Sequence, residues 1–237
     1  MKKLIIGNWK LNPETLTGAI KLAKAVDKRG VIVCPPHAFL GKIAGLLKNS
    51  APCAQDVFYE QKGSFTGGVS PSQLKTIGVK HTLVGHSSRK AKGETDGDVN
   101  KKIKAAFDES LTVILCVGEP INIHKGGITA VKKFVEAQVK KALLKIKPGD
   151  KLIIVYEPIW AIGTKKPDTP EESALVIAHI KDILGRMKWK NIRVLYGGSV
   201  NGQNAKGFLR EKMIDGLLVG MASLDAKEFN KIIGANG

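Results

Sequence analysis

Three residues that could move a proton stand far apart in this sequence. Lys10, His86 and Glu157 each lie just beyond a short run of apolar residues. A carboxylate can take a proton from carbon as a general base. An imidazole and an ammonium group can stabilise the negative charge that then forms on neighbouring oxygen atoms. The three residues therefore fit proton transfer next to a carbonyl group, provided that the fold brings them together.

A second set of residues could bind an anion. Gly197-Gly198-Ser199 and Gly220 follow two further apolar runs. Backbone N–H groups at such turns, close to helix starts, bind phosphate groups, and barrel enzymes often place a phosphate at two such loops late in the chain. A phosphate site beside a proton-transfer site describes an isomerase that acts on a small phosphorylated sugar.

The apolar runs predict eight buried strands. They are short and rich in valine, isoleucine and leucine, which is typical of strands buried on both faces of a parallel sheet. They comprise residues 4–6, 31–34, 51–54, 82–84, 113–117, 152–156, 192–196 and 217–219. Helical periodicity is clearest between them at residues 14–28, 96–109, 128–146 and 170–187.

The alternation of strand and helix predicts an α/β protein, a single (β/α)8 barrel of eight parallel strands with an outer ring of helices. Eight units in 237 residues favour a closed barrel over an open doubly wound sheet. No linker divides the series, so residues 1–237 are expected to form one domain. The carboxyl ends of barrel strands share one rim, where Lys10, His86 and Glu157 should meet.

Local signals predict several helix starts. Asn12-Pro13, Ser70-Pro71 and Thr169-Pro170 each place a capping residue before a proline that is compatible with a first helical turn. Another helical turn is expected at Ser87. Because a helix N-terminus disfavours additional positive charge, the imidazole of the preceding His86 is expected to be neutral.

The composition limits the class of protein. Hydrophobic residues make up 43% of the chain, yet no apolar run reaches the roughly 18 residues of a membrane span. The first residues lack the apolar region of a signal peptide. Cys34, Cys53 and Cys116 are odd in number and lie in or beside apolar runs. We therefore expect buried thiols and a cytoplasmic protein without a membrane partner.

The formal net charge of +17 is the unusual feature of the composition. Such a charge could steer an anionic substrate, contact nucleic acid or simply reflect solvated helix faces. The lysines are spread along the chain, which favours solvated faces. A basic scaffold that binds nucleic acid is the less favoured alternative, because the chain has no recognised nucleic-acid-binding motif.

Six segments, in order along the chain, resemble the triosephosphate isomerase family. A single segment such as GGS would be weak evidence, but the six together span nearly the whole chain. The segments are NWK (8–10), VGHS (84–87), CVGE (116–119), YEPIWAIGT (156–164), YGGSV (196–200) and DGLLVG (215–220). The resemblance implies the TIM barrel fold and an intramolecular oxidoreductase, that is, an aldose–ketose isomerase.

The resemblance also implies a reaction and roles for residues. The family interconverts dihydroxyacetone phosphate and D-glyceraldehyde 3-phosphate through an enediolate, in glycolysis and gluconeogenesis, with neither metal nor organic cofactor. Glu157 would be the base, His86 the electrophile and Lys10 the cationic stabiliser; this family is itself the standard example of such a base, a neutral histidine and a closing lid, here residues 159–164. The implied substrate-binding residues are Asn8, Lys10, Gly163, Ser199, Gly220 and Met221.

One other enzyme class remains as an alternative. A different phosphosugar isomerase or epimerase with a barrel fold would share the phosphate loops. The ordered set of Lys10, His86 and Glu157 argues against it.

The chain departs from the family pattern at four positions. The family usually has glutamate, glutamate, glycine and glycine where this chain has Gly68, Ser88, Met221 and Lys165. The loop around Thr66 resembles the loop that reaches the partner subunit in the family, so a homodimer is expected. Loss of both glutamates removes the acidic neighbours of Arg89 and should weaken the dimer. Ser88 also supplies no charge near Lys10.

Overall fold

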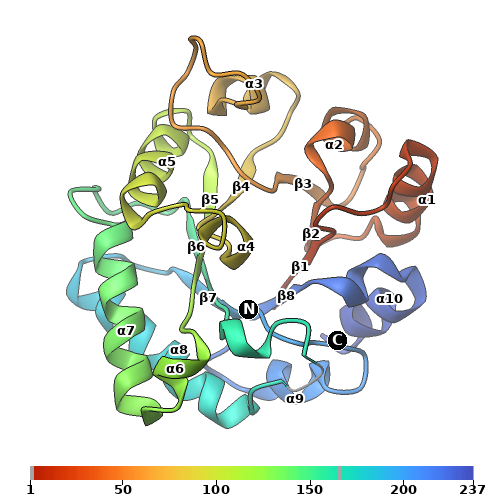
Figure 1. Cartoon of the computed structure of the whole chain (residues 1–237). Coiled ribbons are helices and arrows are strands. Elements are labelled where there is room, and N and C mark those ends of the chain that lie inside the picture. The colour runs from red at the N-terminus through yellow and green to blue at the C-terminus, as the bar shows by residue number, and fades with distance from the viewer. Residues whose placement is uncertain (1–2, 165–166, 237) are drawn as a thin grey trace.

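The strands form a closed barrel in which every neighbouring pair is parallel and β8 pairs with β1 (Figure 1). The computed structural model describes residues 3–164 and 167–236. The strands are β1 (Leu4–Asn8), β2 (Val31–Cys34), β3 (Ala51–Ala54), β4 (His81–Val84), β5 (Thr112–Val117), β6 (Leu152–Tyr156), β7 (Arg193–Tyr196) and β8 (Gly216–Val219). The predicted (β/α)8 TIM barrel and its eight strands are confirmed, and the bounds of three strands match the prediction while those of the other five differ by one or two residues.

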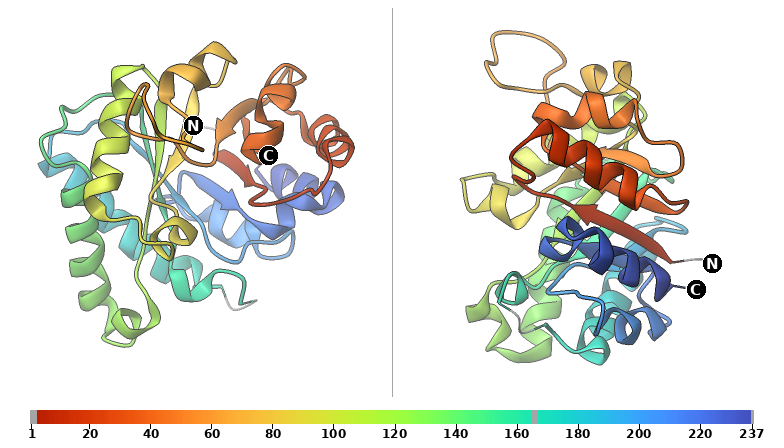
Figure 2. Two further views of the ribbon diagram at one scale, coloured as in Figure 1. Left: turned by 45° about the horizontal axis from the view of Figure 1, so that its top comes forward. Right: turned by 90° about the vertical axis from the view of Figure 1, so that its right-hand side faces the viewer.

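Helices surround the barrel, as two further views show (Figure 2). They are α1 (Leu16–Val26), α2 (His37–Ala44), α3 (Pro71–Thr76), α4 (Ser87–Lys90), α5 (Asp96–Asp108), α6 (Ile121–His124), α7 (Gly127–Ala142), α8 (Pro170–Arg186), α9 (Ala205–Arg210) and α10 (Ala226–Gly234), with 3-10 turns η1 (Ile159–Ala161) and η2 (Met221–Leu224). The four predicted helices are present as α1, α5, α7 and α8. Among the described helices, none has the length and apolar character that crossing a bilayer requires.

The core has two layers, because successive side chains of a strand point to opposite faces. One layer fills the inside of the barrel and includes Ile6, Leu83 and Val155. The other lies between the barrel and the helices and includes Ile5 and Ile154. Both faces of each strand are thus buried, which explains why the strands read as continuous apolar runs. The three cysteines are free and buried, as predicted.

Two of the three predicted helix starts are confirmed. Ser70 and Thr169 cap α3 and α8, and each hydroxyl accepts a hydrogen bond from an N–H of the first turn. The prediction at Asn12-Pro13 is wrong. Thr15 caps α1 instead, and its hydroxyl accepts a hydrogen bond from the N–H of Gly18 at 3.1 Å. The helix therefore starts at the hydroxyl residue that lies nearest to its first apolar positions.

The packing of α10 on the barrel generates a stability prediction. The ring of Phe229 is fully buried, and a Cβ atom at Gly7 of β1 would lie 2.9 Å from it. The change Phe229→Ala should lower the free energy of unfolding by roughly 3–5 kcal/mol, because it removes these contacts and leaves a cavity. Urea unfolding at one fixed protein concentration measures the effect.

The matched control is Leu144→Ala, since the Leu144 side chain is 61% exposed. It should change the free energy of unfolding by less than about 0.5 kcal/mol. Similar losses in both variants would contradict the assignment of Phe229 to the core.

Candidate active site

The carboxyl ends of the strands bring the predicted proton-transfer residues to one cavity. Lys10 follows β1, His86 follows β4 and Glu157 follows β6, and all three line a cavity of ≈ 440 Å³. The other residues of the predicted set that line it are Gly163, Ser199, Gly220 and Met221. Asn8 is the exception, because it is buried and does not line the cavity.

Two glycines allow neighbouring strands to close around Glu157. A Cβ atom at Gly118 would lie 1.8 Å from the carbonyl oxygen of Glu157, and one at Gly197 would lie 2.9 Å from its Cγ atom. The Glu157 backbone N–H donates to the carbonyl oxygen of Val117 at 2.7 Å. Its carboxylate is buried, and Oε2 has no hydrogen-bond partner among the described residues. That oxygen is free to accept a proton from a bound molecule.

His86 is oriented by the helix that it caps. Its Nδ1 atom accepts a hydrogen bond from the backbone N–H of Ser88 at 3.2 Å and lies 2.8 Å from the Ser88 hydroxyl oxygen. A ring nitrogen that accepts this bond carries no proton, so we assign the proton of the neutral ring to Nε2. Nε2 lies 3.7 Å from Oε1 of Glu157. His86 therefore presents an N–H donor beside the carboxylate.

Lys10 has a left-handed backbone conformation, with φ of 54°. This conformation is uncommon for a residue other than glycine and persists where neighbours hold it. Asn8 Oδ1 accepts from the Lys10 N–H at 3.0 Å, and Gln55 Nε2 donates to the Lys10 carbonyl at 2.7 Å. None of the ion pairs among the described residues involves Lys10, and its ammonium group is available to a bound anion.

The lid segment is anchored at its start by Trp160 of η1. Its indole N–H donates to Oε1 of Glu119 at 2.7 Å, and its ring lies 4.0 Å from that of His124, centroid to centroid. Glu119 is fully buried, and burial raises the pKa of its carboxyl group. The Ser199 hydroxyl donates to the carbonyl of Ala161 at 2.6 Å. Lid closure itself stays a prediction, and Lys165 lies outside the described residues.

Comparison with known proteins agrees with this arrangement. A sequence model of the family "Triosephosphate isomerase" matches residues 3–236. The triosephosphate isomerase of Carboxydothermus hydrogenoformans is 42% identical, over 98% of this chain and 98% of that protein. That of Aquifex aeolicus is 39% identical over 98% and 99%, and that of Clostridium tetani 40% over 98% and 96%.

The chain belongs to the triosephosphate isomerase family. Its departures from the family pattern can now be placed. Ser88 lies against the imidazole of His86 and keeps a hydrogen-bonding role there. Met221 begins η2, is 62% exposed and lines the cavity beside Gly220. Within the described residues, no three His, Cys, Asp or Glu side chains gather as a metal site requires.

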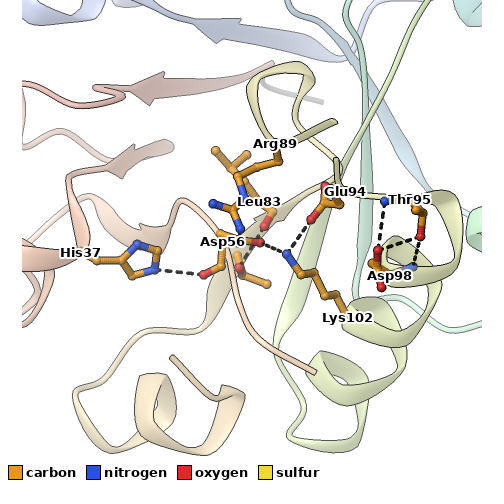
Figure 3. A network of polar contacts seen from close by, with 9 residues as sticks. His37, Asp56, Leu83, Arg89, Glu94, Thr95, Asp98 and Lys102 are labelled. Atoms are coloured by element: carbon orange, nitrogen blue, oxygen red, sulfur yellow. Dashed lines mark hydrogen bonds and ion pairs between the residues drawn. The ribbon is translucent and has the colours of Figure 1, made fainter. Parts of the chain in front are cut away.

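The expectation that Arg89 loses its acidic neighbours needs correction. Its guanidinium lies 2.8 Å from Oδ2 of Asp56 (Figure 3). The other carboxylate oxygen of Asp56 lies 2.6 Å from the ammonium of Lys102, which also contacts Glu94 at 2.5 Å. Lys102 is buried, and a buried charge requires such partners. Asp56 is thus an acidic partner of Arg89 from another loop.

Three residues that shape the site were not predicted from the sequence. Gln55 bonds the backbone of Lys10, Asp56 pairs with Arg89, and the ring of His124 packs against that of Trp160. Each acts through a contact with a residue distant in sequence, and none stands in a motif. One signal was available for Asp56 alone, namely an isolated carboxylate beside the end of a predicted strand.

Asp168, which precedes the cap of α8, generates a pH prediction. Burial raises its pKa to about 6, against the opposing hydrogen bonds from Ser173 and Thr169. The folded state therefore holds the proton to higher pH than the unfolded state, so the free energy of unfolding falls as the pH rises from about 4 to about 6. The change Asp168→Asn should remove this fall.

Relative to the parent, Asp168→Asn should gain up to about 3 kcal/mol of stability between about pH 4 and about pH 7. Urea unfolding at several pH values measures this difference. Asp182→Asn is the control, because the Asp182 side chain is 63% exposed. A difference between Asp168→Asn and the parent that stays constant with pH would contradict the prediction.

Proposed function

We propose that Glu157, His86 and Lys10 perform the isomerisation in this member of the family. As a triosephosphate isomerase, the chain interconverts dihydroxyacetone phosphate and D-glyceraldehyde 3-phosphate, a step of glycolysis and gluconeogenesis. The observation that carries the assignment of roles is the 3.7 Å separation of His86 Nε2 from Glu157 Oε1 inside one cavity. Glu157 can then exchange a proton with the reacting carbon while His86 donates a hydrogen bond to the oxygen attached to it.

The mechanism follows from this geometry. The Glu157 carboxylate takes a proton from the carbon next to the carbonyl group, and the electron pair moves onto oxygen to give an enediolate. The Nε2–H of His86 donates to the oxygens that gain charge, and the Lys10 ammonium stabilises that charge. The proton of the neighbouring hydroxyl group passes to the former carbonyl oxygen, and Glu157 returns its proton to the former carbonyl carbon, which yields the other triose phosphate.

The phosphate group of the substrate is assigned to the loops that follow β6, β7 and β8. We propose that backbone N–H groups of the substrate-binding residues hold it, and that Asn8 positions Lys10 by accepting its backbone N–H. A Cβ atom at Gly220 would lie 3.4 Å from the Lys10 ammonium nitrogen, so this cation stands next to the phosphate loops. The residues proposed to bind the phosphate are Gly163, Ser199, Gly220 and Met221.

We also propose a homodimer formed through the loop around Thr66. Phe65 is 47% exposed, and its ring packs against that of Phe58 with the ring centroids 4.9 Å apart. An exposed aromatic side chain at a loop tip is a good anchor for a partner surface. Free buried cysteines support a cytoplasmic location. The assignment of residues 1–237 to one domain stays a prediction.

The role of Glu157 is tested by the change Glu157→Gln. The amide keeps the size of the side chain and removes the base, so kcat should fall by roughly 10²–10⁴-fold. A coupled assay with D-glyceraldehyde 3-phosphate measures the turnover. The control Glu171→Gln changes an exposed carboxylate on α8 and should turn over like the parent. Parent-like turnover of Glu157→Gln would remove the residue from its assigned role.

The dimer is tested by the change Thr66→Arg. A large charged side chain at the loop tip should prevent close contact with a second copy. Sedimentation velocity over a dilution series should then show a monomer at concentrations where the parent is a dimer. The control Thr17→Arg alters an exposed threonine of α1 and should stay dimeric. If the parent is monomeric throughout, the dimer proposal is wrong.

A further inference from the structure

A second cavity lies at the end of the barrel opposite the active site. Its volume is ≈ 590 Å³, which exceeds the ≈ 440 Å³ of the active-site cavity. Its walls come from the segments that lead into β1, β7 and β8 and from the carboxyl-terminal parts of α8 and α9. Because the strands are parallel, their starts gather at the end away from the catalytic rim. No described residue lines both cavities.

Cationic side chains dominate the lining of this cavity. Five cations and one carboxylate line it among the described residues, which leaves a surplus of four positive charges. The cations are Lys3, Lys181, Arg193, Arg210 and Lys212, and the carboxylate is Asp215. By contrast, Lys10 is the one lysine or arginine among the described residues that line the active site.

Two of these cations already have partners within the protein. The ammonium of Lys3 donates to the carbonyl oxygens of Glu211 and Ile214 at 2.6 and 2.5 Å. The ammonium of Lys181 lies 2.7 Å from Asp215. Lys3 and Lys181 therefore have structural roles at the end of α9 and the start of β8, whether or not the cavity is filled.

The other three cations have no such explanation. The side chains of Arg193, Arg210 and Lys212 form no hydrogen bond or ion pair with the described residues. Like charges held around one cavity repel one another. An anion inside the cavity would relieve this repulsion and give both guanidinium groups partners of the kind they bind best, because the planar guanidinium matches phosphate oxygens in pairs.

We propose that this cavity binds a linear oligophosphate. One phosphate group carries about −1.5 to −2 charges at neutral pH, which leaves about half of the surplus unneutralised. A chain of two or three phosphate groups matches the surplus and the spread of the cations around the cavity. The chain could be inorganic or part of a nucleotide, and the lining also includes the apolar residues Leu184, Ile192 and Leu209.

Calorimetric titration with tripolyphosphate tests the proposal. An equilibrated mixture of the two triose phosphates is present in both the calorimeter cell and the syringe. It keeps the active site occupied throughout the titration. The parent should bind about one tripolyphosphate per chain in a saturable manner. The double change Arg210→Gln with Lys212→Gln should weaken binding about tenfold or more. Both side chains are exposed, and parent-like isomerase turnover will show that the variant is folded.

The matched control is the double change Lys21→Gln with Lys42→Gln. It removes from α1 and α2 two exposed cations that form no ion pair within the described part of the chain, and it should leave the affinity within about twofold of the parent. Equal weakening in both double variants would reveal a response to net charge and overturn the proposal. Absence of saturable binding of tripolyphosphate to the parent would also overturn the proposal. The same holds if the parent binds duplex DNA but not tripolyphosphate.

Metal-free ATP distinguishes the two sources of the phosphate chain. Tighter binding of ATP than of tripolyphosphate, lost in the Arg210 and Lys212 double variant, would support the site and assign it to a nucleotide. Equal affinity for both probes would support the site and assign it to the phosphate chain alone. Binding of ATP that is insensitive to the double variant would overturn the site.

Discussion

The position of the catalytic carboxylate depends on the absence of side chains at two glycines. At Gly118, just beyond β5, the backbone approaches the carbonyl group of Glu157 so closely that even one methyl group would overlap it. At Gly197, just beyond β7, the Cγ atom of Glu157 occupies the space that a side chain would need. Barrel interiors are close-packed, so a bulkier residue at either position would move strands. The 3.7 Å approach of Glu157 to His86 follows from this packing.

The orientation of the His86 imidazole depends on a hydrogen bond that also caps a helix. The first N–H groups of a helix need acceptors, and in α4 one of them bonds Nδ1 of His86. The hydrogen bond that caps this short helix therefore also decides which ring nitrogen carries the proton. Ser88 changes the charge that the family has at that position, but its hydroxyl lies against the same nitrogen. The departure from the family pattern thus alters the surroundings of the histidine without removing its orientation.

Much of this arrangement was predictable from sequence, for a physical reason. Strands buried on both faces must be apolar throughout, so eight runs and the polar residues that follow them predict both the barrel and its active rim. The incorrect predictions concern contacts that no periodic pattern in the sequence reports. Thr15, and not Asn12, caps α1 through a local contact with Gly18, and neighbouring hydroxyl and amide residues compete for that role. Asp56 is the acidic partner of Arg89. This ion pair joins residues distant in sequence and appears only once the chain is folded.

The distribution of charge separates the two ends of the barrel. If the net charge of +17 served mainly to steer the substrate, cations should crowd the catalytic rim. Lys10 instead stands as the one lysine or arginine among the described residues lining that cavity, while five cations line the cavity at the other end. Backbone N–H groups and one ammonium suffice for a single phosphate group. The opposite end of a barrel contributes stability and no catalytic loops, so its surface can hold an anion without disturbing the reaction.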